Sequence, residues 1–100
     1  MKIVNIARLR FAPSAMPQIR DAVAAARAAT LPETGCIQYA FAEDVADPGV
    51  LHVSEIWADR AALDAHIATP HVAQWRATVG AIGVIERDVR VFTVSGEQTL

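Results

Sequence analysis

Residues 36–57 read CIQYAFAEDVADPGVLHVSEIW, a stretch that predicts a β-hairpin. Over residues 36–43, Ile, Tyr and Phe alternate with smaller or polar residues, and this period of two is typical of a strand. The sequence Asp-Pro-Gly at 47–49 predicts a turn, because proline presets φ and glycine allows a positive φ. Residues 50–57 then predict a second strand that pairs back on the first.

The residues before the hairpin predict a strand and a helix. Residues 2–11 are a β-branched and apolar run closed by Ala-Pro-Ser, which indicates a strand ended by a turn. A helix is expected over about residues 16–30, with Pro17 in its first turn and Pro32 ending it. Its apolar residues recur at near-helical spacing, at Met16, Ile19, Val23, Ala26 and Leu31.

The residues after the hairpin predict two helices and a last strand. Asp59 is a suitable N-cap for a short helix that ends at Ile67, and Thr69 before a proline caps the next helix. That helix carries an apolar stripe and ends at two glycines, and residues 85–94 alternate as a strand. The stripe consists of Val72, Trp75, Val79 and Ile82.

The order of these elements, β-α-β-β-α-β with the second helix broken in two, predicts the fold class. It is typical of an α+β, ferredoxin-like split βαβ arrangement, an antiparallel sheet with helices on one face. A chain of 100 residues is expected to form one domain over residues 1–100, since two cores do not fit in this length.

Composition narrows the range of partners. Nine Lys and Arg against eleven Asp and Glu give a net charge of −2 without a basic stripe, so no nucleic acid partner is expected. No apolar run is long enough to suggest a membrane segment, and we expect a soluble, cytoplasmic protein. The single cysteine, Cys36, has no nearby charge partner and is expected to be a buried, unreactive thiol.

The high apolar content predicts a second subunit. Hydrophobic residues make up 53% of the chain, and both faces of the first and third predicted strands are largely apolar. The sheet of a second copy could cover the outer face and bury about 800 Å² per subunit. On that face we expect Arg8 and Glu55 to form a buried ion pair.

Two histidines are candidates for chemistry. His66 shares the inward side of its helix with Leu63 and Ile67, where a histidine either acts as acid, base or donor or is simply a core residue. His71 follows five residues later, near a helix N-terminus that disfavours its cation. No third residue has a suitable spacing for a metal ligand, so no metal site is predicted.

Other polar and aromatic residues leave alternatives open. Asn5 lies in an apolar strand, where its amide either lines a pocket or bonds a neighbouring side chain. The Tyr39 hydroxyl reaches either a pocket or the subunit interface. Trp57 and Trp75 are either core residues or stacking platforms for an aromatic ligand.

Several short motifs resemble the signature of the antibiotic biosynthesis monooxygenase (ABM) domain family. They are GCIQY at 35–39, EIW at 55–57, LDAH at 63–66 and TPH at 69–71. The resemblance covers nearly the whole chain and implies a homodimer of the dimeric α/β barrel type. Haem-degrading members have Trp at the position of His66, Asn at Ala7 and His near Arg76, so haem degradation is disfavoured.

The resemblance implies a function, since several members are monooxygenases that need no cofactor and oxidise quinols or polycyclic phenols with O₂. A small aromatic substrate and O₂ are therefore the expected partners. We predict His66 as the catalytic base and Asn5, Tyr39, His71 and Trp75 as substrate-binding residues. The alternatives are a non-oxidative isomerase that uses His66 as acid and base, and a non-catalytic small-molecule-binding dimer.

Overall fold

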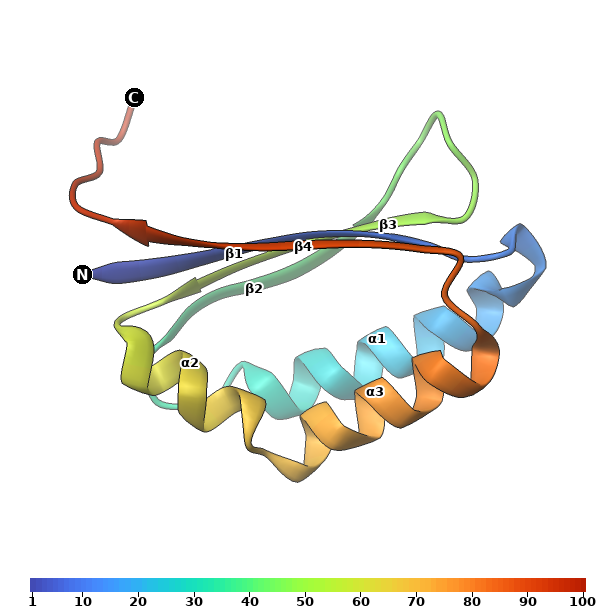
Figure 1. Ribbon diagram of the computed structural model, residues 1–100, viewed down its shortest axis with the longest axis horizontal. Helices are drawn as coiled ribbons and strands as arrows, with labels where there is room; N and C mark the ends of the chain where they lie inside the picture. The colour runs from blue at the N-terminus through green and yellow to red at the C-terminus, as the bar shows by residue number, and fades with distance from the viewer.

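The computed structural model describes residues 1–100 and contains a four-stranded antiparallel sheet with all helices on one face (Figure 1). The strand order is β2-β3-β1-β4, which confirms the predicted fold class. The elements are β1 (Lys2–Arg10), a 3₁₀ turn (Pro13–Ala15), α1 (Met16–Thr30), β2 (Cys36–Glu43), β3 (Val50–Trp57), α2 (Arg60–Ile67), α3 (Pro70–Ile82) and β4 (Glu86–Val94).

Local signals account for the element bounds, which agree with the predicted ones to within one residue. The Asp59 carboxylate accepts a hydrogen bond from the Ala62 N–H at 2.8 Å and begins α2. The Thr69 hydroxyl accepts one from the Val72 N–H at 3.3 Å and begins α3. No side chain caps α1, which instead continues directly from the 3₁₀ turn.

The core lies between the sheet and the helices. One cluster joins inward residues of β1 and β3, such as Leu9 and Val53, to Ile19 of α1 and Val79 of α3. A second cluster joins Ile3, Tyr39, Trp57 and Leu63 under α2. Leu31 does not belong to either cluster, contrary to the predicted stripe, and is 43% exposed. It follows the last residue of α1 and so leaves the buried side of the helix.

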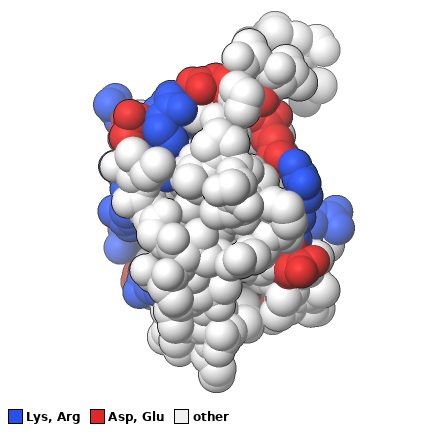
Figure 2. All heavy atoms as spheres, turned by 90° about the vertical axis from the view of Figure 1, so that its right-hand side faces the viewer, with Lys and Arg blue, Asp and Glu red and all other residues white.

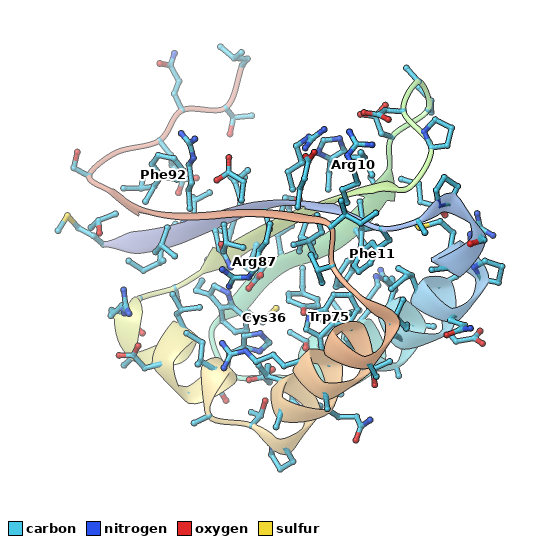
Figure 3. All side chains as sticks on the ribbon, turned by 45° about the vertical axis from the view of Figure 1, so that its right-hand side comes forward. Arg10, Phe11, Cys36, Trp75, Arg87 and Phe92 are labelled. Atoms are coloured by element: carbon cyan, nitrogen blue, oxygen red, sulfur yellow. The ribbon has the colours of Figure 1, made fainter.

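The outer face of the sheet carries apolar side chains beside Arg90 toward one end and charged side chains at the other. Val4, Ile6 and Phe92 share the apolar end, where Ile6 is 45% and Phe92 49% exposed. Arg10 and Phe92 both project from this face, away from the helices (Figure 3). The expectation that both faces are largely apolar is therefore correct for only half of the outer face.

The predicted ion pair between Arg8 and Glu55 is wrong. Strand pairing places Glu55 opposite Asn5, so its side chain lies on the helix side of the sheet, whereas Arg8 lies on the outer side. Instead, the Arg8 guanidinium donates a hydrogen bond to the Glu86 carboxylate at 2.9 Å, and Arg10 forms a bidentate pair with the Asp47 carboxylate. Figure 2 views this end of the molecule, with positive and negative side chains adjacent along its upper margins.

None of the helices is long and apolar enough to cross a membrane.

We expect Gly49→Ala to destabilise the protein. Gly49 has φ of +90°, and an added Cβ would lie 2.3 Å from the carbonyl oxygen of Phe11. Backbone strain of this kind costs about 1–3 kcal/mol, to which the clash adds. In contrast, Gly80→Ala in α3 meets no atom within 4 Å and should stabilise the helix by about 0.5–1 kcal/mol. Urea unfolding of both variants measures the difference, and equal stability of Gly49→Ala and wild type would contradict the expectation.

Candidate active site

A cavity of about 530 Å³ lies between the inward face of the sheet and helices α2 and α3. All four strands contribute to its wall, and 13 of its 20 lining residues are hydrophobic. Its inner lining includes the buried residues Tyr39, Glu55 and His66. The volume suits a ligand of two or three fused rings, because small-molecule sites span about 300–1,000 Å³.

Glu33 organises the two histidines on one side of this cavity. It lies in the loop between α1 and β2 and its side chain is only 15% exposed. Its Oε2 lies 2.7 Å from Nδ1 of His66 and 2.8 Å from Nε2 of His71. A carboxylate only accepts hydrogen bonds, so both nitrogens carry a hydrogen and donate it to Glu33.

This hydrogen bond sets the tautomer of His66. With the hydrogen on Nδ1, Nε2 keeps its lone pair and is the atom available to take up a proton. No side chain lies within hydrogen-bonding distance of Nε2, and its nearest acidic neighbour is Oε1 of Glu55 at 3.9 Å. The His66 ring is held against Trp57 at a centroid distance of 4.6 Å and against Tyr39 at 5.4 Å. His66 is therefore held in one orientation at the cavity wall, with Nε2 free of a side-chain partner.

Glu55 is a second ionisable group in the same wall. Burial raises the pKa of its carboxyl above the usual glutamate range, although a hydrogen bond from Trp57 and the nearby His66 oppose the shift. Nε1 of Trp57 donates to its Oε1 at 3.0 Å, and Nδ2 of Asn5 donates to its Oε2 at 2.8 Å. These two donors hold the carboxyl in one orientation beside His66.

Asn5 and Tyr39 are two further polar residues that line the cavity. The amide nitrogen of Asn5 is used by Glu55, but its buried Oδ1 has no hydrogen-bond partner. Burial raises the pKa of the Tyr39 phenol, with the Glu55 carboxyl adding to the shift, so Tyr39 stays a neutral hydroxyl. An unpartnered buried acceptor is costly, and a ligand hydroxyl could satisfy Oδ1 of Asn5.

Glu33, His66 and His71 also form a set that could hold a metal ion, since their ligand atoms lie within 4.8 Å of one another. Residue spacing near the histidines did not reveal this set, because Glu33 precedes His66 by 33 residues. The observed hydrogen bonds account for this arrangement without an ion. Burial, with Glu33 and Glu55 nearby, raises the pKa of the Cys36 thiol, which disfavours a nucleophilic thiolate.

Comparison with known proteins identifies the family to which this chain is related. The sequence profile of the family "Antibiotic biosynthesis monooxygenase" matches residues 2–78. The chain belongs to the ABM family. The match ends within α3, and β4 completes the fold of this ABM chain beyond it.

Individual relatives support the assignment. Over 80 residues the ABM chain is 38% identical to Rv0793 of Mycobacterium tuberculosis, provisionally named a monooxygenase, with 80% of this chain and 78% of that protein covered. The structure of Rv0793 superposes with a TM-score of 0.88, covering 99% of this chain and 100% of Rv0793, at 31% identity. A Deinococcus radiodurans structure, provisionally described as an antibiotic biosynthesis monooxygenase, has a TM-score of 0.91 over 98% of this chain and 97% of its own, but only 21% identity, and supports the fold alone.

A further relative is longer than the ABM chain. The Synechocystis protein sll1783, whose function is uncharacterised, is 31% identical over 68 residues. The match covers 68% of this chain but only 46% of that protein. The ABM chain thus spans less than half of this relative.

Four of the five predicted site residues line the cavity of the ABM chain. They are Asn5, Tyr39, His66 and Trp75. His71, predicted to bind substrate, is not in the cavity wall and instead lies behind His66, where it shares Glu33. Glu33 and Glu55 were missed as site residues. No local pattern distinguishes the loop residue Glu33, whereas the E-x-W motif marked Glu55 without indicating its face.

We expect the raised pKa of Glu55 to make the free energy of unfolding decrease as the pH rises. Because ionising the buried carboxyl is costly, the stability of the ABM domain relative to Glu55→Gln is greatest below about pH 4.3, the usual glutamate pKa. It falls as the pH rises through the raised pKa of the folded state. Urea unfolding of both proteins between about pH 3 and 8 tests this.

Glu43→Gln is the matched control. The hydrogen bond from Arg20 lowers the pKa of Glu43, so its contribution is present above about pH 4.3 and is lost as the pH falls through the folded-state pKa. The two variants should therefore show pH trends of opposite sign. If the stability of both variants relative to wild type changed with pH in the same direction, burial would not be the factor that controls the pKa of Glu55.

Proposed function

We propose that this ABM protein is a cofactor-independent monooxygenase that oxidises a quinol or polycyclic phenol with O₂. The observation that carries the proposal is the pairing of His66 with Glu33 at the wall of a largely apolar cavity. Nδ1 of His66 donates to Glu33 at 2.7 Å, which leaves Nε2 as a base on a fixed ring. An oriented base next to an apolar binding space is what deprotonation of a phenol requires.

Proton transfer is the first step. The phenol hydroxyl gives its proton to Nε2 of His66, and the resulting imidazolium is stabilised by Glu33 at Nδ1. The phenolate oxygen stays beside the imidazolium, and a second substrate hydroxyl can donate to Oδ1 of Asn5, which has no partner of its own. The apolar wall keeps water away, so the electron-rich anion is not stabilised by hydration.

Electron transfer then uses the substrate as the only reductant. The anion passes an electron to O₂, and the two radicals combine at a ring carbon to form a hydroperoxide after taking up a proton. Loss of water from this hydroperoxide leaves one oxygen atom on the ring. A phenol with a free ring position plus O₂ thus gives a quinone plus water, and a quinol gives a hydroxyquinone plus water.

We also propose that the protein is a homodimer formed through the outer face of its sheet. The exposed apolar side chains at one end of that face, Ile6 and Phe92 among them, support this interface. Sedimentation at micromolar protein should give twice the chain mass of 10.7 kDa. A single species of the chain mass would contradict the dimer.

Oxygen consumption tests the oxidative function. Wild-type protein is mixed with hydroquinones, naphthols and anthrols while dissolved O₂ and quinone absorbance are followed together. We expect one O₂ consumed for each quinone formed, without added flavin or metal. No uptake across the panel would contradict the proposal. Conversion of substrate under nitrogen would favour an isomerase, for which the proximity of His66 Nε2 and Glu55 Oε1, 3.9 Å apart, is the supporting observation.

A further inference from the structure

The cationic side chains of this chain are not equally paired. Six of the nine Lys and Arg residues form salt bridges, namely Lys2, Arg8, Arg10, Arg20, Arg60 and Arg90. The three without an acidic partner are Arg27, Arg76 and Arg87. Arg76 and Arg87 both line the cavity described above, whereas Arg27 lies on α1 outside it.

The two unpaired arginines approach the cavity from different elements. Arg76 projects from α3 one residue after Trp75, and Arg87 is an inward residue of the edge strand β4. Figure 3 shows Arg87 and Trp75 on the helix side of the sheet, with Arg10 and Phe92 on the other side. Both arginines are exposed, unlike His66 and Glu55, so they lie at the mouth of the cavity and the proton-exchanging groups lie at its inner end.

The mouth is positive although the whole chain is negative. The charged lining residues are Arg60, Arg76 and Arg87 against Glu55 alone, and the Asp64 that pairs with Arg60 is not part of the lining. Walls of low polarity focus the field of such charges along the cavity. The mouth therefore attracts anions, while the rest of the wall suits an aromatic ring.

We propose that the substrate is an aromatic acid, a hydroxylated fused ring whose carboxylate is held by Arg76 and Arg87 at the cavity mouth. This rests on the proposed function in taking the cavity as the substrate site, and it names the substrate class. Guanidinium groups bind carboxylates through paired, charge-assisted hydrogen bonds. With the carboxylate at the mouth, the ring lies along Trp75 and its hydroxyl points inward to His66 and Asn5.

Binding without turnover tests the inference separately from the oxygenase. Under nitrogen, calorimetry compares 6-hydroxy-2-naphthoate, whose hydroxyl and carboxylate lie at opposite ends of the ring system, with its neutral carboxamide, which has nearly the same shape. We expect wild-type protein to bind the acid at least about tenfold more tightly, because charge-assisted bonds are lost with the amide. The preference should shrink as sodium chloride is raised.

Variants test which arginines cause the preference for the acid over the amide. Arg76→Gln and Arg87→Gln should each reduce the acid-over-amide ratio, and the double variant should bring it near one, because acid affinity falls much more than amide affinity. Arg27→Gln removes the third unpaired arginine and should leave the ratio as in wild type. Equal binding of acid and amide, failure of either ligand to bind, or a ratio that survives the double variant would overturn the inference. Oxidation of neutral quinols would still test the oxygenase proposal independently.

Discussion

His66→Ala is expected to lower the rate of oxygen uptake by about 10²- to 10⁴-fold, the usual contribution of a positioned general base. The variant keeps the cavity and the Glu55 carboxyl but has no group that can take the phenol proton at the same place. The loss should be smaller with substrates of lower phenolic pKa, because these are already partly ionised in solution. Steady-state oxygen uptake with a series of substituted naphthols measures both effects.

The control for this variant is His52→Ala. His52 lies on the outer face of β3 and bonds Asp44 at 2.9 Å, so its removal should leave uptake unchanged. Equal uptake by His66→Ala and wild type would exclude His66 as the base.

Glu33→Gln tests whether the carboxylate acts through His66. Because Gln cannot stabilise the imidazolium as a carboxylate does, kcat should fall. In the His66→Ala background the same change should have little further effect, since the two residues act as a unit. Additive losses would assign Glu33 a purely structural role.

Trp57→Ala is expected to be the most destabilising single change, by about 3–5 kcal/mol. Trp57 is completely buried, packs with Ile3, Tyr39 and Leu63, and donates its indole N–H to Glu55. Trp57→Phe keeps most of the volume but leaves Glu55 without one donor, which should cost about 1–3 kcal/mol. Urea unfolding at neutral pH measures both variants.

Val45→Ala serves as the control for Trp57. Val45 lies fully exposed in the loop between β2 and β3, and its replacement should change stability by no more than about 0.5 kcal/mol. A loss for Trp57→Ala no larger than that for Val45→Ala would show that Trp57 is not a core residue.

Local sequence patterns were sufficient to predict the strands and helices but not the side-chain contacts between them. The alternation within each strand of the hairpin, the Asp-Pro-Gly turn at 47–49 and the caps at Asp59 and Thr69 involve residues no more than a few positions apart, so their signals can be recognised along the chain. The erroneous pairing of Arg8 with Glu55 shows the limit. Alternation along each strand was correct, but the register that places Glu55 opposite Asn5 depends on how two distant strands meet.

The candidate site shows the same division. Residue type, spacing and family motifs were enough to select four residues of the site. Each is a polar or aromatic residue on an apolar face of a predicted strand or helix, namely Asn5, Tyr39, His66 and Trp75. Glu33 could not be selected, because an acidic residue in a loop is ordinary until the fold brings it within 2.7 Å of a histidine 33 residues later.

By itself, the sequence thus determined the hairpin at 36–57, the other strands and helices, and the family, since these depend on periodicity and short motifs. Only the tertiary structure decided which face Glu55 occupies, which carboxylate orients His66, and which arginines surround the cavity. Those relations join residues on separate elements, and packing of the helices against the sheet is the physical event that brings them together.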